Sequence, residues 1–481
     1  MKILFVGSEA LPFAASGGLG DVMGSLPMAI RAQDPQTMDV RVVMPLYSSI
    51  RGEYREKMTF VKECSVPLAW RQLYCGIWQY EREGVIYYFL DNEYYFKRDS
   101  LYGSFDDAER YAYFSRAVLE MMREIDFYPD VLHANDWQSA LTLIYLRTKY
   151  ACYQPYTGIR TVYTIHNIDY QGVYGQELLG DIFDLGEGER SLVDYRGDIN
   201  LTKGAIVCCD ALTTVSPHYA EEIRDPYFAN GLHYITEQYA YKTRGIVNGI
   251  DTAYYDPANK DDLFAPFTLR SAVTGKRKNK LELQRRMGLP ESEGTPVIAM
   301  VSRLAAHKGF DLVKCVLEQF IAANDVQFVL LGTGEADFEA YFRYLAERYP
   351  ERVACRFLFD KALSKQIYAG ADLFLMPSKS EPCGLSQMIA SRYGAVPIVR
   401  EVGGLYDTIH AYQPAEKTGN GITFYSYNAY DMLDAIRRAV DLYHGDPEGF
   451  KALRRNAMKA DFSWDASASG YLALYRELYR A

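Results

Sequence analysis

The sequence predicts an α/β protein with two domains, each built on a parallel sheet that helices cover. Three observations predict this fold class. Short apolar runs alternate with amphipathic stretches almost throughout, which is typical of βαβ units. Several runs are apolar at consecutive positions, as in strands buried on both faces. At 481 residues the chain is also too long for one ordinary domain, and the strand series starts again about halfway along it.

We expect ten strands from these apolar runs. In chain order they are Ile3–Val6, Asp39–Met44, Val85–Leu90, Val131–His133, Thr161–Ile165, Ala211–Val215, Val297–Val301, Gln327–Leu331, Leu373–Met376 and Pro397–Val399. Apolar residues recur at helical spacing between them, which predicts amphipathic helices over Ala108–Arg123, Trp137–Tyr150 and Ala362–Ala371.

The strand series is interrupted between residues 246 and 297. Ile246–Asp251 closes the first series, an irregular stretch begins at Asp256-Pro257, and the basic, polar segment Lys276–Lys280 comes before the second series. We therefore predict a domain over 1–246, a second over 247–460, a hinge near 246–257, and a helix within the final segment, 461–481.

Composition excludes several classes of protein. The net charge is −10 without a basic block, which argues against a nucleic-acid binder. No stretch approaches 18 consecutive apolar residues, so we expect no membrane span. The eight cysteines form no Cys-x-x-Cys pair, and the first apolar run is too short for a signal peptide. These features predict reduced thiols and a cytoplasmic location.

The first strand is followed by a glycine-rich loop, Ser16-Gly17-Gly18-Leu19-Gly20-Asp21, and Gly403-Gly404-Leu405 echoes it after a strand of the second half. If each Gly-Gly pair opens a helix, each domain offers a helix N-terminus to an anion. Two ordinary strand–helix turns explain the pattern equally well. The glycine spacing and the distance from the strand are wrong for a dinucleotide fingerprint, which argues against a nicotinamide enzyme.

Polar side chains of the second half follow two strands. Arg303 and Lys308 lie on a loop directly after Val297–Val301, where two cations suit a diphosphate, although alone a solvated loop is the simpler reading. Glu381 follows Leu373–Met376, just before a helix expected near Gly384. Its carboxylate suits sugar hydroxyls while the Cys383–Leu385 amides face an anion; the alternative is an acid that caps a helix.

In the first half, His133-Ala134-Asn135-Asp136-Trp137 and Thr164-Ile165-His166-Asn167 each end a strand. A single histidine is more often a satisfied core residue than a ligand. Here several polar groups and a tryptophan converge at the carboxyl ends of strands, which favours a sugar pocket.

Together these segments resemble the bacterial glycogen (starch) synthases, hexosyltransferases that transfer glucose from ADP-glucose to the end of an α-1,4-glucan. The matching stretches are SGGLGDV at 16–22, DDAERYAYFSRAVLE at 106–120, HANDWQSAL at 133–141, TIHNIDYQG at 164–172, VNGID at 247–251, SRLAAHKG at 302–309, EPCGLSQ at 381–387 and GGLYDT at 403–408. The resemblance covers essentially the whole chain. It implies the GT-B fold, in which two Rossmann-like domains face a cleft and the C-terminal helix crosses back to the N-terminal domain.

The resemblance also implies a retaining, metal-independent glycosyltransferase of glycogen biosynthesis. Its partners would be a nucleotide sugar and a glucan, and it would need no cofactor because ADP-glucose is a substrate. Arg303 and Lys308 would hold the diphosphate, Glu381 the glucosyl hydroxyls, and His166 and Asp136 would lie beside the reacting sugar. The donor-binding residues would be Ser16, Gly17, Gly18, Asp21, Asn248, Phe359, Cys383, Gly384, Leu385, Gly403 and Gly404.

Two positions depart from the family pattern. Ala15 stands where relatives carry a lysine, and no Lys or Arg lies between residues 3 and 30; Ile389 replaces the second acid of the wider GT-B pattern, which the synthases commonly lack. The missing lysine leaves two alternatives beside an ADP-glucose enzyme. One is the same chemistry with another donor, such as UDP-glucose. The other is a glucan-binding scaffold without turnover.

Overall fold

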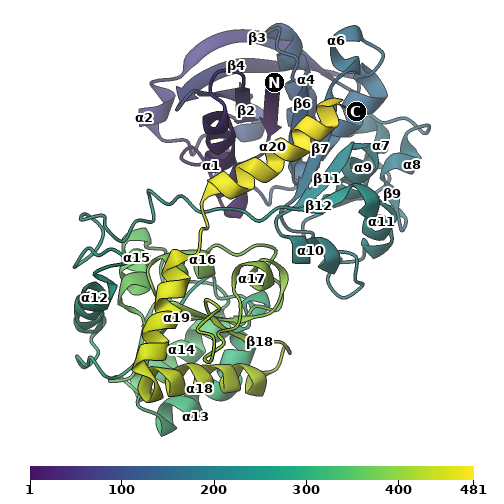
Figure 1. Cartoon of the computed structure of the whole chain (residues 1–481). Coiled ribbons are helices and arrows are strands. Elements are labelled where there is room, and N and C mark those ends of the chain that lie inside the picture. The colour runs from purple at the N-terminus through teal and green to yellow at the C-terminus, as the bar shows by residue number, and fades with distance from the viewer. Residues whose placement is uncertain (481) are drawn as a thin grey trace. The chain divides into compact units, whose positions relative to one another are not determined.

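The computed structural model describes residues 1–480, which divide into two compact units (Figure 1). Unit 1 contains residues 1–249 and the C-terminal helix that begins at Trp464, and unit 2 contains residues 250–463. Of the helices in the described residues, none is both long and apolar enough to cross a membrane.

Unit 1 contains a nine-stranded sheet in the order β12-β11-β7-β6-β1-β2-β5-β4-β3. Seven of its strands are parallel: β1 (Lys2–Val6), β2 (Asp39–Pro45), β5 (Val85–Asp91), β6 (Val131–Asn135), β7 (Arg160–Ile165), β11 (Ala211–Thr214) and β12 (Thr243–Gly245). An antiparallel hairpin, β3 (Thr59–Leu68) with β4 (Arg71–Arg82), extends the edge beside β5. A separate small sheet contains β8 (Val173–Tyr174), β9 (Asp194–Tyr195) and β10 (Asp198–Asn200).

Helices of very different length connect the strands of unit 1. They are α1 (Gly18–Gln33), α2 (Gly52–Arg55), α3 (Glu93–Phe96), α4 (Asp107–Glu124), α5 (Trp137–Tyr145), α6 (Gln154–Thr157), α7 (Leu178–Asp181), α8 (Arg190–Val193), α9 (Leu201–Cys208), α10 (Pro217–Glu222), α11 (His233–Gln238) and α20 (Trp464–Arg480). A π-helical turn, Leu146–Tyr150, continues α5, so the predicted helix 137–150 changes its hydrogen-bond pattern partway. A short 3₁₀ helix covers Ala240–Lys242.

Unit 2 is a parallel six-stranded sheet in the order β15-β14-β13-β16-β17-β18. Its strands are β13 (Val297–Val301), β14 (Gln327–Leu331), β15 (Val353–Arg356), β16 (Leu373–Met376), β17 (Val396–Arg400) and β18 (Ile422–Phe424). Its helices are α12 (Ala272–Met287), α13 (Phe310–Ala323), α14 (Ala336–Arg348), α15 (Lys361–Gly370), α16 (Ser386–Arg392), α17 (Gly403–Thr408), α18 (Ala429–Gly445) and α19 (Pro447–Lys459), with a 3₁₀ turn at Ala306–Lys308.

Strand order fixes where each sheet can hold a ligand. In unit 2 the chain runs outward from β13 to β15 and then returns to β16 on the other side of β13, so the order reverses between β13 and β16. In unit 1 the corresponding reversal lies between β1 and β6. Open parallel sheets bind ligands beside such reversals, at the carboxyl ends of the strands.

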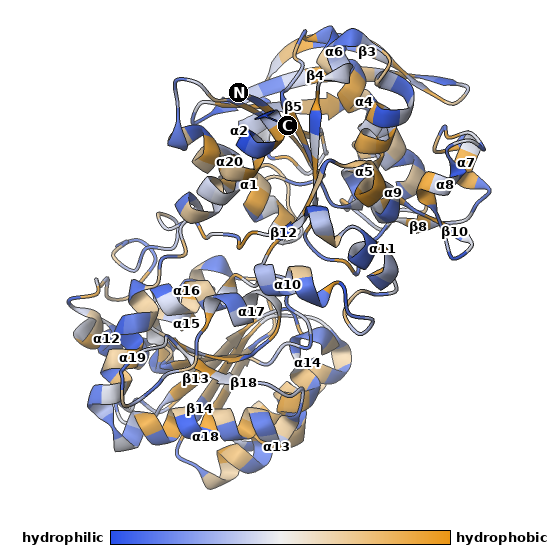
Figure 2. Cartoon of the chain, turned by 45° about the vertical axis from the view of Figure 1, so that its right-hand side comes forward, coloured by the Kyte–Doolittle hydropathy of each residue, from blue (hydrophilic) through white to orange (hydrophobic). Residues whose placement is uncertain are grey.

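Apolar burial accounts for both sheets. Figure 2 shows the central strands largely in the hydrophobic colour and surface helices such as α13 and α18 in both colours. All ten predicted strands are present. The β3–β4 hairpin was not predicted, nor were β12, β15, β18 and the small sheet. In β3 the first five residues are exposed, so it lacks the continuous apolar run that identified the others.

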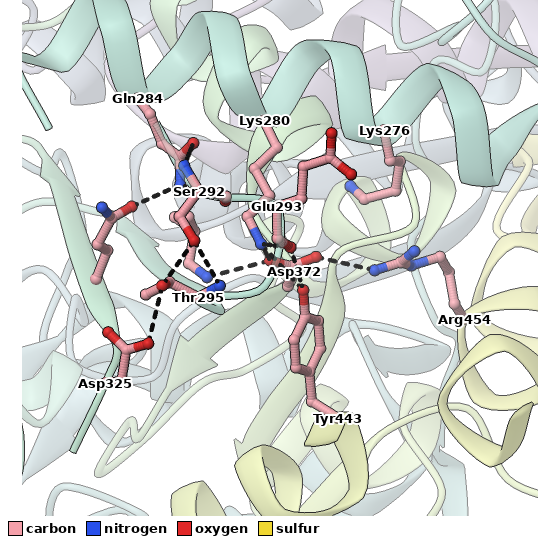
Figure 3. Close-up of polar contacts among 12 residues, drawn as sticks. Lys276, Lys280, Gln284, Ser292, Glu293, Thr295, Asp325, Asp372, Tyr443 and Arg454 are labelled. Carbon is pink, nitrogen blue, oxygen red and sulfur yellow. Dashed lines mark hydrogen bonds and ion pairs between the residues drawn. The ribbon is translucent and has the colours of Figure 1, made fainter. Parts of the chain in front are cut away.

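The basic segment 276–280 was recognised in the sequence only as polar chain before the second strand series. It lies inside α12, where Lys276 and Lys280 are buried (Figure 3). The Lys276 ammonium donates to the carbonyls of Tyr368, Ala369 and Tyr393 at 2.9–3.1 Å. Backbone acceptors distant in sequence therefore satisfy a cation that composition alone assigns to the surface.

Lys280 takes part in a buried ion cluster around Asp372 (Figure 3). Its ammonium lies 2.8 Å from one carboxylate oxygen of Asp372, and the Arg454 guanidinium lies 3.0 Å from the other. Lys280 and Arg454 hold the pKa of Asp372 below its usual value despite the burial of that carboxyl. Within unit 2 the cluster joins α12 and α19 to Asp372, the residue just before β16.

The C-terminal helix α20 is part of the core of unit 1. It packs on α1, and Tyr471 and Tyr475 are fully buried. The Tyr475 hydroxyl lies 2.6 Å from Nδ1 of His133 in the centre of the sheet, and Nε2 of that histidine lies 2.5 Å from Oγ1 of Thr164. His133 is therefore a satisfied core histidine, which was the simpler of the two readings of its motif.

Candidate functional site

The reversal between β1 and β6 holds a loop built around a buried acid, Glu9. Its carboxylate accepts hydrogen bonds from the Ser16 amide (2.7 Å), the Ser16 hydroxyl (2.7 Å) and the Gly17 amide (3.1 Å). The Tyr102 hydroxyl donates a fourth, at 2.6 Å. Glu9 thus ties the glycine-rich loop to the chain segment that precedes α4.

These contacts correct one prediction about the loop. We expected the Gly17 amide to face the donor's phosphates, but it donates to Glu9. The helix α1 begins at Gly18, as the Gly-Gly pattern predicted, and a Cβ added at Gly18 would meet open space. Ala15 is exposed beside this loop, and Asp21 lies in the first turn of the helix.

Asp136 lies in the turn between β6 and α5 with an unusual backbone. Its φ of 57° with ψ of 175° belongs to a region almost restricted to glycine, and such strain, about 1–3 kcal/mol, tends to occur at functional sites. One carboxylate oxygen accepts the His166 amide at 2.8 Å. Burial raises the pKa of the Asp136 carboxyl from 3.8 to about 7, although the His166 amide opposes this. The carboxyl can therefore change its charge near neutral pH.

His166 follows β7 and is held by Asn135. Its Nε2 lies 2.9 Å from Oδ1 of Asn135, whose amide nitrogen donates to the carbonyls of Val6 and His133. These contacts orient the amide, so Nε2 of His166 is the donor and Nδ1 is left without a proton. Burial lowers the pKa of His166 from 6.5 to about 3, which keeps the ring neutral. Asp136 and His166 are thus brought together as predicted.

Asn248 follows β12 and is the last residue but one before the chain passes from unit 1 to unit 2. Its side chain is buried, and Oδ1 makes no hydrogen bond within the residues described. Buried polar atoms without a partner are uncommon and identify a position where a ligand could supply one. This is compatible with its predicted contact with the donor.

In unit 2, the loops after β13 and β16 lie against each other at the reversal. A Cβ on Gly309 would fall 2.1 Å from the carbonyl oxygen of Pro377, so only glycine permits this approach, and its φ of 80° also favours glycine. The Lys379 amide donates to the His307 carbonyl at 2.8 Å. The two predicted motifs, 302–309 and 377–386, therefore form one surface.

Lys308 and Glu381 meet on this surface as an ion pair. The Lys308 ammonium lies 2.7 and 2.9 Å from the two carboxylate oxygens of Glu381, and the Ser378 hydroxyl donates to the same carboxylate at 3.0 Å. Glu381 is 6% exposed. Arg303 is exposed on the same loop and forms no ion pair with any residue from 1 to 480. A free guanidinium and a paired ammonium thus occupy one edge of the sheet.

The predicted glycines of unit 2, Gly384, Gly403 and Gly404, shape the backbone around the 381–383 segment. Gly384 has a φ of 74°, so α16 begins only at Ser386, two residues after the predicted start. The Gly404 amide donates to the Glu381 and Pro382 carbonyls at 3.0 and 3.1 Å, and a Cβ there would lie 2.2 Å from the Cys383 carbonyl oxygen. The second Gly-Gly pair thus supports the 381–383 segment, and Gly403 begins α17 as predicted.

Two further features adjoin the Lys308 loop or its strand edge. A pocket of about 410 Å³ is lined by Ala306, His307, Asp311, Glu335, Lys379 and Tyr427. Phe359 lies before α15 with 84% of its surface exposed, as a stacking surface requires. Within residues 1–480, no group of three or more His, Cys, Asp or Glu side chains is placed to hold a metal ion.

Sequence reasoning missed the residues that support the site. Glu9, Tyr102 and Asn135 hold the glycine-rich loop and the His166 ring. Glu9 was recognisable as an acid just beyond a buried strand at a sheet reversal. Tyr102 carries no such signal, because its partner lies 93 residues away in the chain.

Family models and curated relatives that match this chain are starch synthases, glycogen synthases or glycosyl transferases. A family model described as starch synthase catalytic domain matches residues 2–238, and one described as glycosyl transferases group 1 matches residues 284–459. Glycogen synthases from Bacillus cereus (strain B4264) and Alkaliphilus metalliredigens (strain QYMF) are each 46% identical, with 99% of this chain and 100% of the relative covered.

Solved structures extend the likeness. The catalytic domain of starch synthase IV from Arabidopsis thaliana, bound to ADP and acarbose, matches with a TM-score of 0.90 at 32% identity, covering 100% of this chain and 99% of that one. Sucrose-phosphate synthase from Thermosynechococcus elongatus matches with a TM-score of 0.62 at 18% identity, which supports the fold alone.

Proposed function

Because the chain belongs to the family of bacterial glycogen synthases, which are GT-B glycosyltransferases, we propose that it moves glucose from ADP-glucose to the non-reducing end of an α-1,4-glucan with retention of configuration. The observation that carries the proposal is the Lys308–Glu381 pair at the sheet reversal of unit 2. The related starch synthase IV, which was solved with ADP, supports the choice of donor.

The chemistry follows from charge. As the bond between the anomeric carbon and the diphosphate breaks, negative charge develops on the leaving ADP. Arg303 and Lys308 provide fixed positive charge for it, and such groups act mainly on the transition state. This electrostatic role can replace a metal ion, so we propose a metal-independent reaction.

The other residues hold and shield the sugar. Glu381 accepts hydrogen bonds from glucosyl hydroxyls, and the neutral His166 lies beside the positively charged carbon that develops, which a protonated ring would repel. Asp136 positions the donor or the acceptor. The amides of Gly18 and of Cys383–Leu385 contact the phosphates, Asn248 contacts the sugar and Phe359 stacks on adenine.

The test is incorporation of labelled glucose. The protein is incubated with labelled ADP-glucose and glycogen, with EDTA present, and the expected result is a longer glucan. A Glu381→Ala variant is the matched control and should incorporate little. If no nucleotide-glucose leads to incorporation of labelled glucose into glycogen, the proposal is wrong.

Ala15 favours a second candidate, the same transfer from another donor such as UDP-glucose. Ala15 is exposed, and no cation lies on this loop to contact the donor. Competition of ADP-glucose and UDP-glucose at equal concentration separates the two candidates. A clear preference for UDP-glucose would overturn the first.

A further inference from the structure

Two cysteines lie directly opposite each other in the β3–β4 hairpin. The strand register pairs Cys64 of β3 with Cys75 of β4. In an antiparallel pair, opposite residues point to the same face of the sheet, so the two thiols are neighbours. All eight cysteines of the chain are free thiols in this structure, as the sequence predicted. The pairing of Cys64 with Cys75 was not visible in the sequence, because the hairpin itself was not predicted.

The hairpin geometry suits a bond between the two sulfurs. The last pair before the two-residue turn is Leu68–Arg71, and such a pair exchanges two backbone hydrogen bonds. Hydrogen-bonded and non-hydrogen-bonded pairs then alternate, so Cys64–Cys75 is again a hydrogen-bonded pair, with a usual Cα separation of about 5.5 Å. Disulfides bridge Cα atoms that are about 4.4–6.8 Å apart. The backbone therefore need not move for the bond to form.

The two thiols already contact each other under α4 (Asp107–Glu124). The Cys75 thiol donates a hydrogen bond to the Cys64 sulfur. Val66 and Leu68, which share this face of β3 with Cys64, are fully buried. Tyr113 of α4 makes a further hydrogen bond to Cys75. The thiol pair thus lies at the margin of the apolar contact between the hairpin and α4.

The two cysteines differ in access and in acidity. Cys64 is half-buried on the edge strand of the sheet, whereas Cys75 has no exposed surface. The hydrogen bond from Cys75 lowers the pKa of the Cys64 thiol, although burial opposes this. The same hydrogen bond, together with burial, raises the pKa of the Cys75 thiol well above its usual value. Because the thiolate is the nucleophile, Cys64 is the thiol that reacts first with a reagent from solvent.

We propose that Cys64 and Cys75 are a redox modification site, at which a small-molecule disulfide such as glutathione disulfide reversibly oxidises the two thiols to one intramolecular disulfide. The site lies outside the residues assigned to the proposed function and needs no substrate of that reaction. Its product would join the edge strand β3 covalently to β4.

The reaction is two successive thiol–disulfide exchanges. The Cys64 thiolate attacks one sulfur of the small disulfide, whose S–S bond breaks, and the released half takes up the Cys64 proton as a thiol. The Cys75 sulfur then attacks Sγ of Cys64, gives up its proton and displaces the second half, also as a thiol. Two protein thiols are oxidised and one small disulfide is reduced to two thiols. An excess of small thiol reverses both steps.

Peptide mapping of the full chain tests the site directly. Trypsin cuts after Lys62, Arg71 and Arg82, so it separates Cys64 from Cys75, and only a disulfide keeps peptides 63–71 and 72–82 together. The protein is equilibrated with mixtures of reduced and oxidised glutathione, remaining thiols are blocked with N-ethylmaleimide, and the peptides are identified by mass spectrometry. We expect the linked pair to be at least tenfold more abundant in excess oxidised glutathione than in excess reduced glutathione. Amide hydrogen exchange in β3 should be slower in the oxidised protein.

Single variants test the order of attack. Cys75→Ala should stop at a mixed disulfide between Cys64 and glutathione. In Cys64→Ala, the buried Cys75 should be modified at least tenfold more slowly than Cys64 is in the wild type. Cys315→Ala is the matched control, which removes an exposed cysteine of unit 2 and should leave the yield of linked peptides unchanged.

Three results would overturn the proposal. The first is a wild-type protein without linked peptides at every glutathione ratio. The second is a Cys75 that glutathione modifies as fast in Cys64→Ala as it modifies Cys64 in the wild type. The third is a disulfide between the Cys64 residues of two copies of the chain, seen as a dimer in non-reducing electrophoresis. Glucose transfer is not measured in any of these experiments, so their failure would leave the proposed function unaffected.

Discussion

The ammonium of Lys308 lies within 2.9 Å of both carboxylate oxygens of Glu381, so the group expected to bind phosphate and the group expected to bind sugar are directly paired. Each holds the other's charge in place at the edge of the sheet. A donor that contacts both groups must share them, which couples its phosphate end to its sugar end through one hydrogen-bonded pair.

Removing the positive charge of Lys308 should slow the chemical step more than it weakens the binding of ADP-glucose. Lys308→Met should lower kcat by about 10²–10³, by analogy with acyl-transfer enzymes, where removing one fixed donor aimed at developing negative charge has this effect. KM for ADP-glucose should change much less. Steady-state kinetics measures both constants, and a variant with an increased KM but a normal kcat would show that Lys308 contributes ground-state binding only.

Removing the negative charge of Glu381 should affect ADP binding and glucose transfer in opposite directions. In Glu381→Gln the Lys308 ammonium loses its charged partner and is more available to phosphate. We expect ADP to bind at least as tightly as in the wild type by calorimetry, while glucose transfer falls steeply. Weaker ADP binding in this variant would argue that the pair is needed to position Lys308.

Asp136 should make stability depend on pH. Burial raises its pKa from 3.8 to about 7, so the folded protein binds more protons than the unfolded chain between about pH 4 and 7. Its contribution to the free energy of unfolding therefore falls as pH rises through this window, by about 4 kcal/mol in all. Asp136→Asn should match the wild type near pH 4 and be more stable at pH 8.

Urea unfolding of wild type and variant across this range checks the prediction. The exposed Asp99→Asn substitution serves as the control and should follow the wild type at every pH. Parallel curves for Asp136→Asn and wild type would mean that Asp136 stays ionised in the folded protein.

Glu9 should position the glycine-rich loop. Glutamine has one oxygen where the carboxylate has two, so its NH2 group would face either the amides of Ser16 and Gly17 or the hydroxyls of Ser16 and Tyr102. Losing one hydrogen bond to a charged group costs about 1.5–3 kcal/mol, so Glu9→Gln should reduce kcat/KM by about 10–100-fold. Hydrogen exchange at the amides of residues 15–18 should quicken.

Tyr102→Phe provides the graded control, because it removes one of the four donors and leaves the carboxylate. Its effect on kcat/KM should be smaller than that of Glu9→Gln. Normal activity in Glu9→Gln with unchanged exchange would assign Glu9 no part in holding the loop.

The Asp372 cluster should contribute to the stability of unit 2. Lys280→Met removes a buried partner of a buried carboxylate, and breaking such pairs costs about 3–5 kcal/mol. Arg454 remains beside Asp372, so we expect the lower end of that range in chemical denaturation. Arg285→Met, on the exposed side of the same helix, should leave the midpoint almost unchanged. Equal midpoints for Lys280→Met and wild type would contradict this assignment.

Sequence reasoning succeeded where a local pattern carries the information. The strands that continuous apolar runs identified are buried on both faces, and the rule that ligands bind at the carboxyl ends of strands located Arg303, Lys308, Glu381, Asp136 and His166. Sequence reasoning failed where contacts between residues distant in the chain determine the surroundings of a side chain. The carbonyls that accept the Lys276 ammonium come from residues more than 90 positions away. The pairing of Lys308 with Glu381 likewise depends on two loops that only the folded sheet brings together.

The place of α20 in unit 1 has a consequence for biosynthesis. Tyr471 and Tyr475 complete the core around His133, yet the ribosome makes all of unit 2 before it reaches them. While unit 2 is being synthesised, residues 1–249 therefore lack α20, and the surfaces of His133 and α1 that α20 later covers stay exposed. Domains commonly fold in the order in which they leave the ribosome, N-terminal domain first. Here unit 1 is synthesised first, but it can complete its core only after α20 has been made at the end of synthesis.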